Sequence, residues 1–315
     1  MKRIAIASLA GFLLLAGAAR GQFDVPRQPG GVALDKPLTQ RWQVGVVIHA
    51  TGGPSSDLFG TLPVPTDWPE QTVRVVAEDV SPLVSATTYR DLEGIRQMLF
   101  RIPRLPAGES AQALVTLEIT KHSVLPPEAP QQLAIPRNAP REVRGYLGDS
   151  PQIAVRDAGV RRALGEIVQG KTGAWEEVEA IYDWVRDRIA YREGKEKGAA
   201  ATLRDGFGNK HDVTSLFIAL CRAHKVPART VWVPDHVYAE FYLMDEQGAG
   251  RWYPCQVAGP RDFGGLSDNR LILQKGENIT VPEERGAQRF VPEFLRGKGP
   301  GSPRVEFVRK LLPAE

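Results

Sequence analysis

The side chains that could do covalent chemistry in this sequence gather between residues 203 and 259. They are Lys210, His211, Asp212, Cys221, His236 and Cys255. An imidazole can act as a general base, and a thiolate or a neutral amine can attack an acyl group. The stretch therefore holds residue types that amide hydrolysis or acyl transfer needs, provided that the fold brings them together.

One helix and three strands are predicted to position these side chains. A glycine-containing loop at 205–209 leads into Lys210, and apolar residues then recur at helical spacing until Val226-Pro227 ends the helix. The apolar stripe consists of Val213, Leu216, Phe217, Leu220 and Cys221. The strands are expected at 229–233, 237–243 and 251–256. Lys210 should therefore lie at a helix N-terminus, where Asp212 is expected to cap or charge the helix.

The order and spacing of these segments resemble the transglutaminase-like superfamily, whose fold is papain-like. The matching segments read GNKHD, LFIALCRAHKVPAR, HVYAEFY and WYPCQ. The resemblance implies an α+β fold in which a helix packs on an antiparallel sheet. In the family, a cysteine at the helix start, a histidine and an aspartate form a catalytic triad. Their positional equivalents in this sequence are Lys210, His236 and Gln256.

Two of these three implied positions depart from the family pattern. The helix dipole and a histidine stabilise a thiolate at the first position, whereas the same place opposes the ammonium of Lys210. The amide oxygen of Gln256 could still orient His236, although it would stabilise an imidazolium less than a carboxylate does. We therefore predict that cysteine-dependent catalysis is absent. The alternative is a desolvated Lys210 whose neutral amine is the nucleophile.

Neither cysteine is expected to replace the missing nucleophile. Cys221 lies eleven residues beyond Lys210, on the same helix face but about 16 Å further along the axis. It is interpreted as a small core residue. Cys255 is adjacent to Gln256 on a strand, so the two side chains should point to opposite faces. Export would permit a disulfide between the cysteines, and the sequence leaves that pairing open.

No metal or cofactor site is predicted. His211 and Asp212 are adjacent at a helix start, so they do not share a face, and no third ligand near His236 is evident. The CxxC spacing typical of many zinc sites does not occur in the sequence. Any chemistry is therefore expected from the side chains alone.

The first 21 residues read as a signal peptide. A basic start precedes an uncharged apolar run from Ile4 to Ala18, and Ala19-Arg20-Gly21 offers small residues for cleavage after Gly21. A retained membrane anchor is the alternative, but the run is short for a bilayer. We predict a secreted or periplasmic protein with no membrane span after cleavage.

The charge balance argues against nucleic acid as a partner. The 315-residue chain carries 40 basic and 37 acidic residues, a formal net charge of +3. The predicted signal peptide holds Lys2, Arg3 and Arg20 and no acidic residue, so the mature chain would be neutral. A neutral chain has no electrostatic reason to bind nucleic acid or anionic lipid. A peptide, a protein or a cell-envelope polymer stays open as the partner, and so does the oligomeric state.

Composition divides the mature chain into five segments. Residues 22–38 are rich in Pro, Gly and Gln and are expected to form a flexible leader. Strand patterns and turn-like stretches over 39–125 predict a small β-sandwich. A run of prolines predicts an extended linker over 126–150. The transglutaminase-like domain is expected over 151–260, followed by a C-terminal extension at 261–315 whose packing the sequence leaves open.

Hydrophobic periodicity supports both predicted domains. In the stretch 114–121, Val115, Leu117 and Ile119 alternate with polar residues, the pattern of a half-buried strand. Over 174–189, apolar and aromatic residues recur at helical spacing. We interpret these aromatic side chains as core rather than as part of a cofactor site.

Three functions are compatible with these features. The first is a non-catalytic extracytoplasmic protein that keeps the cleft of the fold to bind a peptide or polymer. The second is a protease or amide transferase that uses His236 with altered partners. The third is a scaffold in which the β-module binds and the core domain acts as a spacer. The first is preferred because Lys210 stands where the resemblance requires a thiol.

Overall fold

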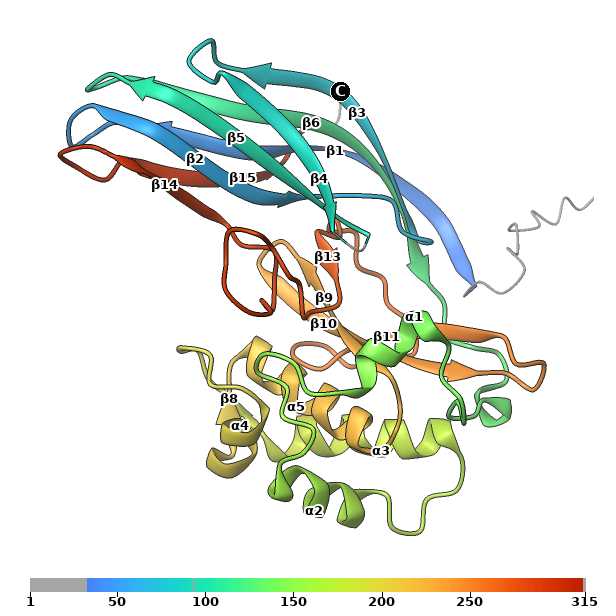
Figure 1. Cartoon of the computed structure of the whole chain (residues 1–315). Coiled ribbons are helices and arrows are strands. Elements are labelled where there is room, and N and C mark those ends of the chain that lie inside the picture. Colours follow the sequence, from blue (N-terminus) through green and yellow to red (C-terminus); the bar gives the residue numbers. More distant parts are fainter. Residues whose placement is uncertain (1–32, 93, 314–315) are drawn as a thin grey trace, which may run out of the picture.

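The computed structural model describes residues 33–92 and 94–313, and it confirms an α+β fold with a β-sandwich beside a helix-and-sheet core (Figure 1). The sandwich lies at the top of the view, the helices lie at the bottom, and a second set of strands lies between them. The predicted signal peptide, residues 1–21, lies outside the described residues. Within the described ranges, none of the helices is long and apolar enough to cross a membrane.

The sandwich consists of two four-stranded antiparallel sheets. One sheet has the order β15-β1-β6-β3 and the other has the order β14-β2-β5-β4. The strands from the first part of the chain are β1 (Leu34–His49), β2 (Ser55–Val64), β3 (Gln71–Val80), β4 (Ala86–Leu92), β5 (Ile95–Leu105) and β6 (Ser110–Val124). The strands from the last part are β14 (Phe294–Lys298) and β15 (Arg304–Leu311).

The period-two pattern predicted around residue 117 is present in β6. Val115, Leu117 and Ile119 are buried between the two sheets, while the threonine and glutamate residues between them are only partly buried. These side chains pack against apolar residues of β1, β2 and β5, such as Val44, Leu62 and Phe100. Alternation along each strand thus gives the sandwich its own hydrophobic core.

The sandwich is not continuous in sequence. β14 pairs with β2, and β15 pairs with β1 from Trp42↔Leu311 to His49↔Arg304. The range 261–315, predicted as an extension, therefore contributes two of the strands that complete the sandwich. β1 also begins at Leu34, inside the range expected to be a flexible leader. The composition of 22–38 suggested mobility, but backbone pairing of Pro37 and Leu38 with β6 orders its last residues.

The core domain packs helices against a five-stranded antiparallel sheet, as the resemblance implied. The sheet order is β12-β11-β10-β9-β13. Its strands are β9 (Ala228–Val233), β10 (His236–Met244), β11 (Gly250–Gln256), β12 (Asp262–Phe263) and β13 (Gln274–Lys275). The helices are α2 (Ala158–Ile167), α3 (Ala174–Arg188), α4 (Ala199–Asp205) and α5 (Lys210–Ala223). A short parallel pair, β7 (Ala190–Tyr191) and β8 (Phe207–Gly208), precedes α5.

Helix α5 is the centre of this domain. It is buried on nearly every side from Asp212 to Arg222, because α2, α3 and α4 surround it and the strands β9 and β10 lie against it. The aromatic residues of α3 belong to the same core, where Trp175 packs edge-on against Phe241 and Tyr182 packs against Phe217. Their interpretation as core is therefore confirmed.

The proline-rich segment between the two domains contains short helical turns. These are η1 (Pro130–Gln132), α1 (Arg141–Arg144) and η2 (Gly145–Leu147). The segment is anchored at several points, for example by the pairing of Ala134 with Met244 of β10. Because of such contacts, the linker is held against the core domain and is not a flexible connection.

Hydrogen bonds and buried ion pairs hold the sandwich against the core sheet. Lys275 of β13 contacts Glu70 beside β3 at 2.5 Å and Glu240 of β10 at 2.6 Å. Gln71 exchanges two side-chain hydrogen bonds with the backbone of Ile272. Lys121 of β6 donates to the carbonyl of Arg270 at 2.6 Å. The two domains are therefore joined by buried polar groups as well as by packing.

Candidate functional site

The N-terminus of α5 is capped by Asn209 together with Asp212. The Asn209 side chain accepts hydrogen bonds from the backbone amides of His211 (2.9 Å) and Asp212 (3.0 Å). The Asp212 carboxylate in turn accepts from the Asn209 amide at 3.1 Å, which completes a capping box. Gly208 allows this approach, since a Cβ there would come within 2.6 Å of Asp212 Cβ. Lys210 therefore occupies the first position of a well-defined helix.

Asp212 also holds a neighbouring loop in place. Its other carboxylate oxygen accepts from the backbone amides of Lys197 (2.8 Å) and Gly198 (2.9 Å). The residue is buried, and these contacts use both of its oxygens. The structure thus gives Asp212 the capping role expected from the sequence.

Lys210 reaches across to the turn that precedes His236. Its Nζ donates to the backbone carbonyl of Asp235 at 2.8 Å. Pro234 and Asp235 form the two-residue turn between β9 and β10, and Asp235 takes a left-handed backbone with φ 58°, which aspartate tolerates better than most residues. The turn places His236 at the first position of β10, beside the helix end that carries Lys210.

His236 is held as a neutral imidazole. Burial lowers its pKa to about 4, and the positive charges of Arg270 and Lys210 act in the same direction, while Asp268 opposes them. A side-chain hydrogen bond with Gln256 also favours the protonated ring, but it is outweighed. Nε2 of His236 is buried and has no hydrogen-bond partner among the described residues. At neutral pH the ring therefore offers an unoccupied nitrogen.

Gln256 ends β11 and is fixed by its backbone. Its carbonyl accepts hydrogen bonds from the Tyr182 hydroxyl (2.8 Å) and from Arg186 (3.1 Å), both on α3. The residue is 8% exposed, and its side chain contacts the imidazole of His236. The structure thus brings Lys210, His236 and Gln256 into one neighbourhood from α5, β10 and β11.

Both cysteines lie in the hydrophobic core. Both are free and buried, and each belongs to the core cluster around α5. Burial raises the pKa of the Cys221 thiol well above its ordinary value, and it does the same for Cys255. A protonated, buried thiol is a poor nucleophile. The structure therefore provides no thiol for acyl transfer within the described residues.

His211 contacts different partners from those of His236. Its Nδ1 lies 3.5 Å from a carboxylate oxygen of Glu196, too far for a hydrogen bond, and its ring packs edge-on against Phe290. Burial lowers the pKa of His211 to about 4, and Arg289 and Lys210 add to that effect. Within the part of the chain that the structure describes, no group of three or more His, Cys, Asp or Glu residues could hold a metal ion.

The sequence reasoning missed one ion pair near His236. Arg270 and Asp268 contact each other through several hydrogen bonds, the shortest at 2.6 Å. Both charges act on the pKa of His236, in opposite directions. They come from the irregular segment after β12, where the sequence shows no hydrophobic period and no motif. Only the tertiary fold brings this segment beside β10.

The chain is similar to one protein family and to solved structures. Residues 161–257 match the family model of the transglutaminase-like superfamily. A solved structure of a candidate cysteine protease from Cytophaga hutchinsonii matches with a TM-score of 0.57 and 15% identity, covering 89% of this chain and 94% of the other. A solved structure of a candidate protease from Parabacteroides distasonis matches with a TM-score of 0.29 and 12% identity, over 70% of this chain and 47% of the other.

No curated protein matches the chain. The similarity to the Cytophaga hutchinsonii structure extends over both the sandwich and the core, so the two proteins share a fold at low identity. The family match begins within α2 and ends just after β11. It thus includes the capped helix start and the strands that carry His236 and Gln256. Residues 161–257 of this chain are therefore a domain of the transglutaminase-like superfamily.

Proposed function

We propose that this protein is a non-catalytic, extracytoplasmic member of the superfamily that binds a peptide or a cell-envelope polymer. The observation that carries the proposal is the position of Lys210. It stands at the capped start of α5, beside His236, where the family resemblance requires the cysteine nucleophile. An amine there replaces the thiol, and both cysteines of the chain are buried elsewhere.

The electrostatics of the site support a loss of thiol chemistry. A cysteine protease stabilises its thiolate with a nearby imidazolium and the positive end of a helix. Here burial holds the pKa of His236 down, with Arg270 and Lys210 acting in the same direction, so the imidazolium does not form at neutral pH. Gln256 supplies a neutral partner where a carboxylate would stabilise the charged ring. Both features disfavour the thiolate–imidazolium pair on which cysteine-protease chemistry depends.

The proposed ligand class follows from the same resemblance. The structural relative from Cytophaga hutchinsonii is described as a candidate cysteine protease, and a protease acts on a peptide. A protein that keeps the fold of such an enzyme without its nucleophile can keep the recognition of an extended chain. A peptide or a cell-envelope polymer is therefore the proposed partner.

An assay on the wild-type protein tests this proposal. We expect iodoacetamide to leave the folded protein unmodified, because Cys221 and Cys255 are buried and their pKa values are raised. We also expect no hydrolysis of peptide or glutamine-amide substrates. Mass spectrometry would follow the alkylation, and ammonia or peptide release would follow the hydrolysis. Iodoacetamide-sensitive turnover would contradict the proposal.

A second candidate is an amidase in which His236 is the base and a group other than a thiol is the nucleophile. The observation that favours it is the neutral imidazole, which has an unoccupied Nε2 and a hydrogen bond to Gln256. Such an enzyme would give turnover that iodoacetamide leaves unchanged. His236→Ala would abolish that turnover, which separates this candidate from a contaminating hydrolase.

The proposed location predicts a specific mature terminus. The basic start, the uncharged run and the small residues around position 20 match the substrate of signal peptidase. Expressed with its native leader in a bacterial host, the protein should appear outside the cytoplasm, and N-terminal sequencing should begin at Gln22. Gly21→Pro is expected to block the cleavage. A full-length cytoplasmic product would exclude this part of the proposal.

A further inference from the structure

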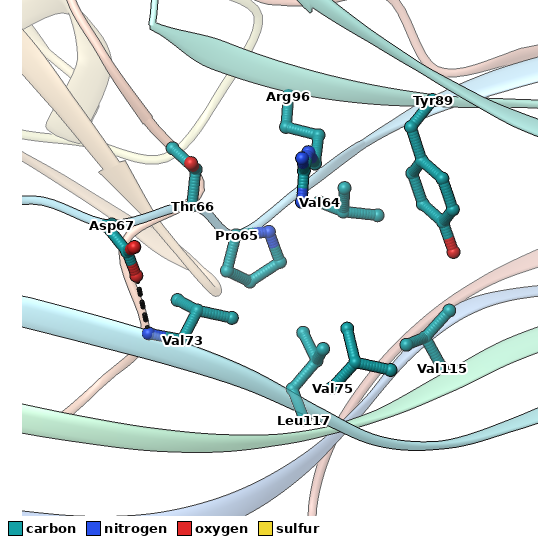
Figure 2. A pocket seen from close by; sticks show the side chains of 10 residues that line it. All are labelled: Val64, Pro65, Thr66, Asp67, Val73, Val75, Tyr89, Arg96, Val115 and Leu117. Carbon is teal, nitrogen blue, oxygen red and sulfur yellow. Dashed lines mark hydrogen bonds between the residues drawn. The ribbon is translucent and has the colours of Figure 1, made fainter.

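The β-sandwich is open along one side, between the edge strands β3 and β4. A cavity of about 170 Å³ lies between the sheets at this side. Val73, Val75, Val115 and Leu117 line it from the sheet that contains β3 and β6 (Figure 2). The cavity belongs to the sandwich and is separate from the neighbourhood of Lys210, so it serves neither candidate function above. We call it the edge groove.

The two edge strands beside the edge groove, β3 and β4, carry exposed apolar side chains. Half of the large apolar or aromatic side chains that are exposed in the described part of the chain lie on β3 and β4. They are Val75 (52%), Val76 (39%), Val80 (36%) and Tyr89 (41%). Exposed apolar side chains beside a cavity, as Val75 and Tyr89 are here, are typical of a binding site.

One guanidinium faces this apolar surface. Arg96 of β5 enters the edge groove from the opposite sheet, beside Tyr89 (Figure 2), and its guanidinium carbon lies 5.8 Å from the centre of the tyrosine ring. Asp91 contacts Arg96 through Nε at 3.4 Å, and both side chains are well exposed. An exposed pair with this geometry contributes little. The terminal nitrogens of Arg96 can therefore bind another anion.

The acidic groups around the edge groove are already engaged. Asp67 accepts a hydrogen bond from the Val73 amide at 2.7 Å. Glu78 accepts one from the Tyr89 hydroxyl at 3.2 Å, which links β3 to β4 across the opening. Among the residues that line the groove, Arg96 is the cation, and its contact with Asp91 through Nε leaves its terminal nitrogens available to an anionic ligand.

We propose that the edge groove binds a small carboxylic acid whose apolar body is about the size of a benzene ring. A cavity of about 150 Å³ is known to admit benzene, so the available volume suits such a body. The carboxylate would pair with Arg96, for which the planar guanidinium is well shaped. The apolar body would lie against Val75 and Leu117 and cover surface that is otherwise in contact with water.

Titration calorimetry of the full chain with three matched ligands tests this proposal. Benzoate, benzyl alcohol and benzylamine share a ring and differ in charge. We expect benzoate to bind at least tenfold more tightly than benzylamine, with benzyl alcohol between them. Arg96→Gln should weaken benzoate binding about tenfold, the usual effect of losing a charged hydrogen bond, and should leave benzyl alcohol unchanged. Val75→Trp should abolish the binding of all three ligands by filling the mouth of the groove.

Arg104→Gln is the matched control, because Arg104 is an exposed arginine on the same strand that does not line the edge groove. Three results would overturn the proposal. The first is benzylamine binding as tightly as benzoate, and the second is equal effects of the Arg96 and Arg104 variants on benzoate binding. The third is a protein that binds none of the ligands; if it also forms a dimer that Val75→Trp dissociates, a second copy covers the groove.

Discussion

Lys210→Cys is expected to create a thiol that reacts with iodoacetamide roughly tenfold faster at pH 7 than an ordinary exposed cysteine. The first position of α5 places the sulfur beside unpaired helix amides and the positive end of the helix dipole, which lower a thiol pKa. The substitution also removes one of the charges that hold down the pKa of His236. The thiolate fraction should rise from a few per cent to a majority, and the lower intrinsic nucleophilicity of an acidic thiol offsets part of that gain.

Lys298→Cys provides the reference rate of alkylation. Lys298 is highly exposed on β14, a strand of the sandwich, whereas Lys210 lies in the core domain. His236→Ala in the Lys210→Cys background should return the rate toward that reference. If the new thiol reacts at the reference rate, and His236→Ala leaves that rate unchanged, the placement of Lys210 opposite His236 is wrong. The family assignment of residues 161–257 would be unaffected, because it rests on the domain as a whole.

The same background can show whether the rest of the site still supports catalysis. Lys210→Cys alone should give weak amidase activity, because Gln256 offers the imidazolium a neutral partner. Adding Gln256→Asp should increase that activity by stabilising the charged ring. An increase that depends on His236 would support the proposal that this protein lost its nucleophile from an otherwise intact arrangement.

Lys275→Met is expected to lower the free energy of unfolding by about 3–5 kcal/mol, the usual cost of leaving a buried charge without its partner. Lys275 lies between Glu70 and Glu240, and all three side chains are nearly inaccessible to solvent. Glu240 would retain Arg229 at 2.7 Å. Glu70 would lose the ammonium that pairs with it, at the junction of the sandwich and the core. Urea denaturation followed by circular dichroism measures the loss.

Lys298→Met is the matched control, because its pair with Asp57 is exposed on both sides and should contribute less than about 1 kcal/mol. Glu70→Gln in the Lys275→Met background should recover much of the loss by removing the unpaired charge. Equal effects of the Lys275 and Lys298 variants would show that the buried cluster does not hold the domains together.

The pH dependence of the same cluster has a definite sign. Burial alone would raise the pKa of Glu240, but the charges of Lys275 and Arg229 outweigh burial and lower it below the ordinary value of 4.5. A depressed carboxyl pKa stabilises the folded protein above the unfolded value, and that contribution is lost as the pH falls below it. The wild-type protein should therefore lose part of its advantage over Lys275→Met in acid.

The sequence was sufficient for the parts of the site that depend on local rules. Asp212 was expected to cap or charge the start of the helix, and the structure places it in a capping box with Asn209. The apolar stripe from Val213 to Cys221 predicted the burial of α5, and the two cysteines are in the core or its sheet as expected. Helix caps and hydrophobic periods act over a few residues, so a single sequence displays them directly.

The parts that the sequence did not reveal all depend on contacts between distant segments. Nothing in the composition of 261–315 predicts that β15 pairs with β1. Glu70 and Lys275 read as ordinary surface charges until the fold buries them together. Arg270 is similar, since its effect on His236 requires an irregular segment to lie beside β10. Burial of a charge depends on the tertiary arrangement, so it cannot be predicted from the local sequence pattern.

The pairing of β15 with β1 also constrains the order in which the protein can form. During synthesis, the sheet that contains β1 and β6 must keep one edge unpaired while the whole transglutaminase-like domain is made, because the strand that covers this edge is Arg304–Leu311. An unpaired edge can associate with other chains. The core domain, whose contacts are more local, can fold first and shorten the distance that the late strands must close. The folded core domain would thus help the sandwich to form, because the strands of the sandwich come from the chain segments before and after the core domain.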